Sequence, residues 1–346
     1  MLSACRVMQI TEFDNGDTAL YCIRVMPQMS KSTTVKGAAY TKLFLAISEL
    51  EKRRGSKVFC VIHNGAGHIC EPSLLLPVII KRKEFKKGKS LDLLIHSNGG
   101  EADSAYRLVK FLRGRYATVT ALIPLHAKSA ATLMCLGADR IVMGEFAHLG
   151  PVDVQLMDPL HRGAEYFSPL NEFKAMDFLR DYAVELVDFF TGLFLQRSGM
   201  SVKDALHETI PCVTAILRPL YAQVDPIEMG EHRRSLAIGE EYANRLLDAV
   251  KNPHRERIVE KLVWKYPSHD FSIDRDEARD LGLPVEKMNE KDEDALLNAI
   301  TELKAYEMSY CGFAPALPAA KKGTAKKQSP KGVPTARPRP PATAAA

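Results

Sequence analysis

Apolar runs and small-residue turns alternate twice in the middle of the chain. Residues 91–96 and 118–124 are mostly apolar, which is typical of buried strands. Each run ends in a turn of small residues, and apolar positions at helical spacing follow over about residues 101–113 and 129–137. The pattern predicts two successive strand–turn–helix units. Because their parallel strands would end side by side, the two turns should meet at the edge where open α/β folds place their sites.

The same periodicity predicts the other elements of an α/β fold. Buried-type strands are expected at residues 57–63 and 140–143, and the weak alternation within residues 1–36 is enough for a strand or a hairpin. Residues 72–89 hold an apolar stretch and a basic run, which we interpret as a solvated connector. Helices are expected over residues 37–53, 172–196, 228–251, 254–264, 273–281 and 292–306, with a further capped helix beginning at Ser201.

The composition changes abruptly near the C-terminal end. Residues 313–346 are rich in Pro, Ala and Lys and have no apolar periodicity. We expect this tail to be disordered, because it cannot bury enough apolar surface to offset its chain entropy. Residues 1–312 are assigned to one folded α/β domain. The longest apolar run of that domain, residues 74–80, is far shorter than the ~20 residues needed to span a bilayer.

Positive charge is concentrated in the tail. The chain has a net charge of +5, but the tail carries seven basic and no acidic residues, so the rest of the chain carries −2. A folded part that is not basic argues against specific nucleic-acid binding. The tail itself could make weak contacts with anionic membrane or nucleic acid, and its alternative role is a solubilising extension.

The cysteines and the N-terminus indicate the compartment. The seven cysteines are scattered and form no C-x-x-C pair, which fits reduced thiols better than disulfides or a zinc site. The N-terminus contains acidic residues and no apolar core of signal-peptide length. The histidines lack the spacing of metal ligands. We therefore expect a cytoplasmic protein without a metal ion or a cofactor.

The two small-residue turns carry groups suited to acyl transfer. Ser129 follows a strand and heads an apolar helix, whose free N-terminal amides favour a developing oxyanion. Gly99 and Gly100 allow backbone conformations closed to other residues and leave an amide free to face a ligand. The turns together predict an oxyanion hole formed by the amides of Gly100 and Ala130. The alternatives are that Ser129 is a helix N-cap and that the glycines form an ordinary turn.

Several blocks of the sequence resemble one family of proteinases. The segment IHSNGGEADSAYRLVKFLR is similar to the S-P-G-G turn and helix shared by the Clp protease proteolytic subunit and signal peptide peptidase A. The segment LIPLHAKSAATLMCLGADRIVMGEFAHLGPVDVQL resembles the serine dehydrogenase proteinase (SDH) family of Clp-fold serine proteinases, in which the serine turn is followed by L-G-P-V-D-x-Q. Nearer the C-terminus, WKYPSHDFSI and EARDLGLPV are similar to that family's H-D-x-x-I and E-A-x-x-L-G-L-P-V.

The resemblance implies a Clp/crotonase-type fold of repeated ββα units with a C-terminal helical region. It also implies that Ser129 is the nucleophile. Asp153 and Gln155 match the L-G-P-V-D-x-Q block, and we expect them to line or orient the site together with Gly99.

The sequence departs from the family pattern at three positions. Ala130 and Ala131 stand where the family has glycines after the serine, and Asn98 stands where it has a proline. These changes remove no catalytic group, because the oxyanion donors are backbone amides. The alanines would narrow the cleft, so they bear on substrate preference.

A serine hydroxyl needs a general base, and the chain offers three candidates. Clp subunits use a histidine and an aspartate, whereas signal peptide peptidases use a lysine from a separate segment. Lys174 is the first choice, because the first turn of a long helix favours a neutral amine. Its alternative is an exposed lysine on an amphipathic helix. His148, next to the L-G-P-V-D-x-Q block, and His161, in an irregular loop, are the other candidates.

We therefore expect a serine endopeptidase that acts on protein or peptide substrates. The resemblance implies a homo-oligomer of rings or stacked trimers, in which the helix at 172–196 is a candidate for the contact. One alternative is a catalytically inactive Clp-fold scaffold or binding protein, because the base is unassigned. The other is a crotonase-like acyl-CoA enzyme, which uses the same pair of oxyanion amides but needs no serine nucleophile.

Overall fold

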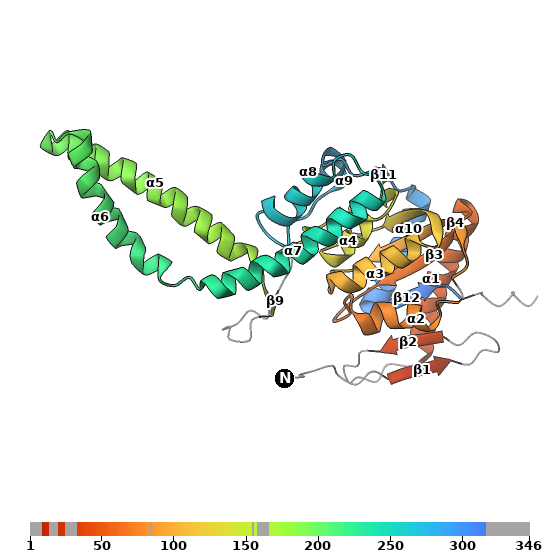
Figure 1. Cartoon of the computed structure of the whole chain (residues 1–346). Coiled ribbons are helices and arrows are strands. Elements are labelled where there is room, and N and C mark those ends of the chain that lie inside the picture. The colour runs from red at the N-terminus through yellow and green to blue at the C-terminus, as the bar shows by residue number, and fades with distance from the viewer. Residues whose placement is uncertain are drawn as a thin grey trace, which may run out of the picture. The chain divides into compact units, whose positions relative to one another are not determined.

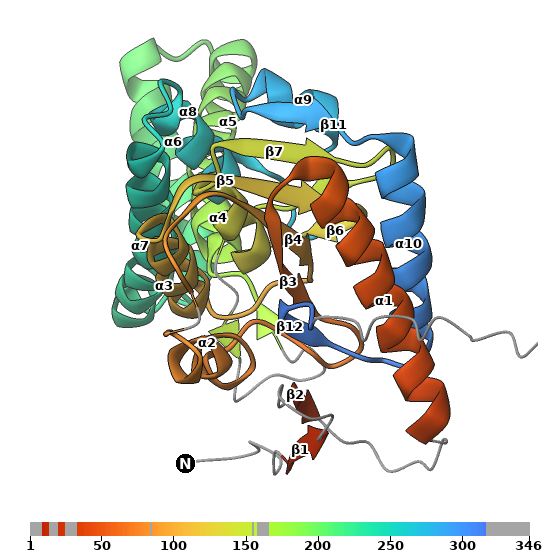
Figure 2. The same cartoon turned by 90° about the vertical axis from the view of Figure 1, so that its right-hand side faces the viewer.

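The protein is built around one six-stranded sheet. The computed structural model describes residues 9–13, 20–24, 33–83, 85–153, 156–157 and 166–315. Figure 1 shows the elements of the chain, and Figure 2 labels the six strands of the sheet in their order, β11–β7–β5–β4–β3–β12. All neighbouring strands are parallel except β12, which runs antiparallel to β3. The strands are β3 (Lys57–Ile62), β4 (Gly88–His96), β5 (Tyr116–Ile123), β7 (Arg140–Met143), β11 (Val285–Lys287) and β12 (Tyr310–Phe313).

The central strands form where the sequence is most apolar. The predicted strands at residues 57–63, 91–96, 118–124 and 140–143 are confirmed as β3, β4, β5 and β7. Each of the four begins at an exposed or half-buried residue and is fully buried towards its C-terminal end. Both sheet faces are covered there, which explains why these runs are continuous rather than alternating.

Helices cover both faces of the sheet (Figure 2). On one face, Leu93 of β4 belongs to the same core cluster as Leu108 of α3 and Leu133 of α4. On the other face, α1 and α10 pack against each other and α1 contacts β3. The helices of the two layers are α3 (Ala102–Arg113), α4 (Ala130–Leu136) and α7 (Pro226–Ala249) on the first face, and α1 (Thr33–Arg54) and α10 (Glu290–Ala305) on the second.

The predicted helices are present with small shifts of their ends. Ser201 caps its helix as predicted, because its side chain accepts a hydrogen bond from the Asp204 amide. The helix predicted over residues 254–264 is divided into an α-helix and a π-helical turn. These remaining elements are α5 (Leu170–Ser198), α6 (Val202–Tyr221), α8 (Arg255–Glu260), the π-helical turn η2 (Lys261–Lys265) and α9 (Arg275–Asp280).

Two segments differ from the sequence-based interpretation. The predicted connector at residues 72–89 contains the π-helical turn η1 (Glu71–Leu75) and the short helix α2 (Leu76–Ile80). Phe313, which we assigned to the tail, is the last residue of β12, and its ring lies 5.2 Å from the ring of Phe59. The remainder of the tail, from residue 316 onward, lies outside the described residues.

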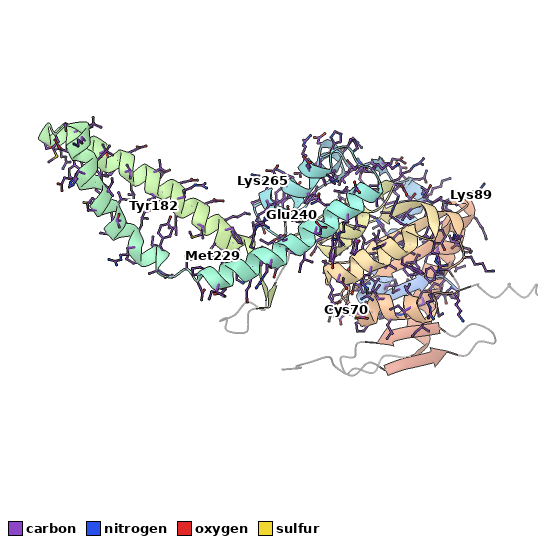
Figure 3. All side chains as sticks on the ribbon, viewed as in Figure 1. Cys70, Lys89, Tyr182, Met229, Glu240 and Lys265 are labelled. Atoms are coloured by element: carbon purple, nitrogen blue, oxygen red, sulfur yellow. The ribbon has the colours of Figure 1, made fainter. Side chains whose placement is uncertain are left out.

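The long helices α5 and α6 pack on each other, and α5 also contacts α7. Most side chains of α5 are half-buried or exposed, and Leu170 is its single buried residue (Figure 3). Large apolar side chains remain exposed on both helices: Phe178, Val184, Phe189, Ile210 and Ile216. The helix predicted at 172–196 therefore lies mostly outside the core of the sheet.

The smaller strands pair locally. The hairpin expected within residues 1–36 is formed by β1 (Gln9–Phe13) and β2 (Leu20–Arg24), which are antiparallel. The strands β9 (Leu156–Met157) and β10 (Tyr166–Phe167) form a second antiparallel pair. None of the helices in the described ranges has the length and apolar content that a membrane crossing requires.

Candidate active site

The two predicted turns lie side by side at the carboxyl edge of the sheet. A short strand, β6 (His126–Ala127), follows β5 and pairs in parallel with β8 (His148–Leu149), so β5, β6 and α4 form one ββα unit. Ser97, at the end of β4, forms a parallel bridge with Ala127. The Lys128 amide donates to the Ser97 carbonyl at 3.0 Å. The glycine turn and the serine turn are therefore held together by backbone hydrogen bonds.

Ser129 has a strained backbone. Its φ is 50° and its ψ is −120°, a combination that residues with a Cβ atom rarely adopt. Ser129 occupies the N-cap position of α4, but its side chain accepts no capping hydrogen bond. The residue is half-buried. The geometry thus does not support the N-cap alternative, and it leaves the hydroxyl available at the surface of the turn.

Two backbone amides next to Ser129 have no acceptor among the residues that the structure describes. Gly100 forms a parallel β-bridge with Ile69. The hydrogen bonds of this bridge come from the adjacent residues: the Ile69 amide donates to the Gly99 carbonyl, and the Glu101 amide donates to the Ile69 carbonyl. Within the described residues, the amide of Gly100 donates to no acceptor. The same is true of Ala130, which is the first residue of α4. The predicted donor pair therefore has no hydrogen-bond acceptor in the described part of the chain.

Gly99, which precedes Gly100, lies against Ser129 and the Ala130 amide. Its φ is +110°, and a Cβ atom at this position would lie 2.8 Å from the Ser129 Cβ and 3.1 Å from the Ala130 nitrogen. Ser97 holds the glycine turn, because its Oγ accepts a hydrogen bond from the Gly99 amide at 3.1 Å. His63 Nδ1 lies 3.2 Å from the same Oγ. The glycine turn therefore has a defined position relative to Ser129.

Four histidines lie near this edge of the sheet. The rings of His96 and His126 are 4.2 Å apart, and those of His126 and His148 are 5.7 Å apart. Burial lowers the pKa of His63 to about 4, of His96 to about 3 and of His126 to about 4, and it also lowers the pKa of His148. These imidazoles are therefore neutral at pH 7. Within the described residues, no hydrogen bond joins His148 to Ser129.

Asp153, in the segment that follows Gly150, forms a pair with His269 from a distant part of the chain. Asp153 is buried, and its Oδ1 is 2.8 Å from His269 Nδ1. Its other oxygen accepts a hydrogen bond from Ser168 Oγ at 2.7 Å. Asp153 was predicted to orient the site. The sequence analysis did not name His269 as a candidate base. Its signal was the family-like block WKYPSHDFSI, which contains this histidine.

Lys174 lies beside the same segment. Its Nζ donates to the Tyr266 carbonyl at 2.5 Å, three residues before His269. Lys174 and Asp153 thus both hold the chain around His269. No hydrogen bond joins Lys174 to Ser129 within the described residues, so its assignment as the base stays a prediction.

The segment that carries Asp153 is anchored close to the serine turn. The Gly150 amide donates to Thr132 Oγ1 of α4 at 3.0 Å. A Cβ atom at Gly150 would lie 3.2 Å from the Lys128 Cβ, next to Ser129. Asp153 follows Gly150 by three residues, which span at most about 11 Å. The remaining predicted site residues, Gln155 and His161, lie outside the described residues.

One group of side chains in the described ranges has the composition of a metal site. Ligand atoms of Glu172, Glu228 and His232 all lie within 4.8 Å of one another. His232 Nδ1 is 2.6 Å from the Glu172 carboxylate, and this contact joins α7 to α5 as a hydrogen-bonded pair. Because that pair satisfies both groups without an ion, we assign no metal to it.

Comparison with known families agrees with the predicted resemblance. Residues 19–163 match the ClpP-like SDH-type serine proteinase family. The predicted resemblance is thereby confirmed, and with the parallel-dominated sheet it gives the protein a ClpP-like α/β fold. The matched span includes Gly100, Ser129 and Asp153, and it ends before Lys174 and His269.

Two relatives come from the archaeon Methanocaldococcus jannaschii. One uncharacterized protein is 28% identical over 264 residues, which cover 71% of this chain and 76% of the relative. A second uncharacterized protein is 32% identical over 124 residues, which cover 33% of this chain and 42% of that relative. Among solved structures, a variant of the membrane-bound stomatin-specific protease 1510-N matches with a TM-score of 0.26 and 15% identity, covering 44% of this chain and 68% of that chain.

Proposed function

On the premise that residues 19–163 match the ClpP-like SDH-type serine proteinases, we propose that the protein is a serine peptidase with Ser129 as its nucleophile. The observation that carries this proposal is the backbone of Ser129, strained at a φ of 50° beside the free amides of Gly100 and Ala130. Such strain costs about 1–3 kcal/mol and persists where the surrounding structure imposes it, often at functional sites. Because the Ser129 side chain makes no capping hydrogen bond, helix capping does not explain this strained backbone.

The proposed reaction uses these groups in sequence. The Ser129 hydroxyl attacks the carbonyl carbon of the scissile peptide bond, and a base accepts its proton. The amides of Gly100 and Ala130 donate hydrogen bonds to the oxyanion that develops on the carbonyl oxygen. The base then returns the proton to the leaving amine, and water releases the acyl group in a second round of the same chemistry. No cofactor is needed.

His269 is the base that the described geometry favours. Asp153 holds the Nδ1 atom of the ring, which fixes the tautomer and leaves Nε2 to face a substrate or a serine. The pair therefore has the arrangement of the base and its orienting carboxylate in a catalytic triad. Hydrogen bonds between a serine and its base are often long before substrate binds, so the absence of a Ser129 contact does not count against His269.

Lys174 is the second candidate base. It borders the same segment, through the hydrogen bond from its Nζ to the Tyr266 carbonyl. In the proposal with His269 as the base, the same hydrogen bond makes Lys174 a positioning residue for the 266–269 segment.

The substrates that we propose are proteins or peptides, and the enzyme is proposed to work as a homo-oligomer. The helices α5 and α6 support the proposal of a homo-oligomer, because both expose large apolar side chains. This helix pair contacts the rest of the chain mainly through α7. Exposed apolar surface of this kind is typical of interfaces.

A fluorophosphonate probe, which reacts with activated serines, tests the proposal. We expect the wild-type protein to be labelled at Ser129 and to cleave an unfolded protein substrate, and the Ser129→Ala variant to do neither. Ser201→Ala is the matched control, because Ser201 is an exposed helix N-cap and its loss should leave labelling unchanged. Folding of each variant is checked by thermal melting.

Other outcomes would favour the alternatives. Folded wild-type protein that is neither labelled nor active would indicate a scaffold that has kept the fold and lost catalysis. Hydrolysis of acyl-thioesters that survives in Ser129→Ala would indicate a crotonase-like enzyme, which depends on the oxyanion amides alone.

A further inference from the structure

The short helix α2 presents apolar side chains to solvent. Leu76, Ile79 and Ile80 are 44%, 40% and 57% exposed. Their positions i, i+3 and i+4 place them on one face of the helix. Val78, on another face, is buried in the core. The helix therefore has one apolar face that the fold uses and a second that it leaves uncovered.

A run of cations follows this exposed face. Arg82, Lys83, Lys86, Lys87 and Lys89 are all exposed, and Glu84 is the single acidic residue among positions 81–89. None of the five cations forms an ion pair with a carboxylate of the described residues. Figure 3 labels Cys70, which precedes this segment, and Lys89, the last cation of the run.

The basic run is attached to the fold at defined points. Phe85 is buried, with its ring 5.0 Å from that of Phe313 and 5.2 Å from that of Phe111. Arg82 donates to the Ile79 carbonyl at 2.9 Å, and the Gly88 amide donates to the Arg115 carbonyl at 3.0 Å. The cations thus lie on two short stretches between anchors, directly after the apolar face.

We propose that this region docks on an anionic lipid membrane. The α2 surface, as we call it, consists of Leu76, Ile79 and Ile80 together with Arg82, Lys83, Lys86 and Lys87. Its aliphatic side chains would enter the boundary between head groups and acyl chains, while the cations contact the lipid phosphates. The two contributions are needed together, because a few aliphatic side chains alone bind a bilayer weakly and reversibly.

Charge argues for a lipid partner rather than a second copy of this chain. A two-fold contact between two α2 surfaces would bring their cations against each other, which is unfavourable. An anionic membrane complements both the charge and the aliphatic character of the α2 surface. The docking requires no activity at Ser129.

Co-sedimentation of the full chain with lipid vesicles tests the proposal. We expect binding to vesicles of equimolar phosphatidylserine and phosphatidylcholine and none to phosphatidylcholine alone. Binding should weaken strongly in about 1 M salt, where the Debye length falls to about 3 Å. The double variant Lys86→Glu/Lys87→Glu should lose about 25-fold or more in affinity, since each basic residue near the surface contributes about fivefold. Ile79→Ser/Ile80→Ser should also reduce binding.

Matched variants distinguish vesicle binding by the α2 surface from vesicle binding by the basic tail, because the tail is unchanged in every variant. Ile227→Ser/Ile238→Ser removes two exposed isoleucines of α7, outside the proposed oligomer contact, and Lys203→Glu/Lys251→Glu reverses two exposed lysines elsewhere. Both controls should bind vesicles like the wild type. All the substituted side chains are exposed, and thermal melting checks the fold of each variant.

Three results would overturn the proposal. The first is wild-type protein that stays in the supernatant with both kinds of vesicle. The second is unchanged binding by both α2 variants, which would assign the binding to another region, such as the tail. The third is a change in the sedimentation of Ile79→Ser/Ile80→Ser without vesicles, which would show that the α2 surface is a contact between copies of the chain.

Discussion

Gly99 lies directly against Ser129. A Cβ atom at position 99 would lie 2.8 Å from the Ser129 Cβ and 3.1 Å from the Ala130 nitrogen. The φ of Gly99, +110°, is also one that other residues rarely adopt. Glycine is therefore required here for both space and conformation, and the relationship ties the glycine turn to the serine turn.

We expect Gly99→Ala to disable the site. The added methyl group must displace Ser129 or the Ala130 amide, and losing one oxyanion donor costs about 10²–10³-fold in rate. The strained φ should also lower the free energy of unfolding by about 1–3 kcal/mol. Fluorophosphonate labelling and urea unfolding measure the two effects. Gly192→Ala is the control, because a Cβ atom there meets nothing within 4 Å. Labelling of Gly99→Ala at the wild-type rate would contradict the proposed geometry.

Replacing Ser129 should separate its chemical role from a structural one. A capping serine would lose about 1 kcal/mol on replacement by alanine, but Ser129 caps nothing, so we expect Ser129→Ala to unfold at nearly the wild-type urea concentration. Ser129→Gly should be more stable by about 1 kcal/mol or more, because glycine relieves the strain at a φ of 50°. Destabilisation of Ser129→Ala by about 1 kcal/mol, with Ser129→Gly close to the wild type, would restore the N-cap interpretation.

Variants of the candidate bases should show which group accepts the proton. If His269 is the base, His269→Ala should lower the labelling rate by about 10²–10⁴-fold. Asp153→Asn should lower it too, because the amide no longer favours the productive tautomer of the ring. Lys174→Met should have a smaller effect, through the position of the Tyr266 carbonyl. The reverse order, with Lys174→Met the most damaging and His269→Ala nearly normal, would identify Lys174 as the base.

The exposed side chains of α5 should hold the proposed oligomer together. Phe178 and Phe189 are 64% and 63% exposed, so replacing both with serine should leave the fold intact. We expect wild-type protein to sediment as an oligomer and Phe178→Ser/Phe189→Ser as a smaller species. An unchanged sedimentation coefficient in the variant would place the contact elsewhere.

The sequence predicts those parts of the fold that depend on local pattern. The strands β4 and β5 are continuous apolar runs, and the adjacent turns identify Gly100, Ala130 and Ser129, which the structure brings together. The strands β11 and β12 are only three and four residues long, and they exist because the sheet offers them a partner. Their pairing is a tertiary property that periodicity cannot show.

The same limit applies to the base. Asp153, Lys174 and His269 lie in three separate segments, and only folding places them around one short stretch of chain. The family block around His269 was visible in the sequence, but its contact with Asp153 was not. The position of Lys174 at a helix start is a local feature that the sequence shows. Its hydrogen bond to the Tyr266 carbonyl joins it to a segment far along the chain, which only the fold brings close.

Protein stability should fall as the pH drops below about 6.5. Burial is the main cause that lowers the pKa of His63 to about 4, of His96 to about 3 and of His126 to about 4, from 6.5. Below pH 6.5 the unfolded chain therefore binds protons that the folded chain does not. The stability from these neutral imidazoles is complete above pH 6.5 and is lost towards pH 4, by up to about 1.4 kcal/mol per pH unit for each. Urea unfolding from about pH 7 to about pH 5 measures this slope. His96→Gln keeps a donor for Asn64 and should reduce the slope by about one proton, whereas an unchanged slope would show that His96 is charged in the folded protein.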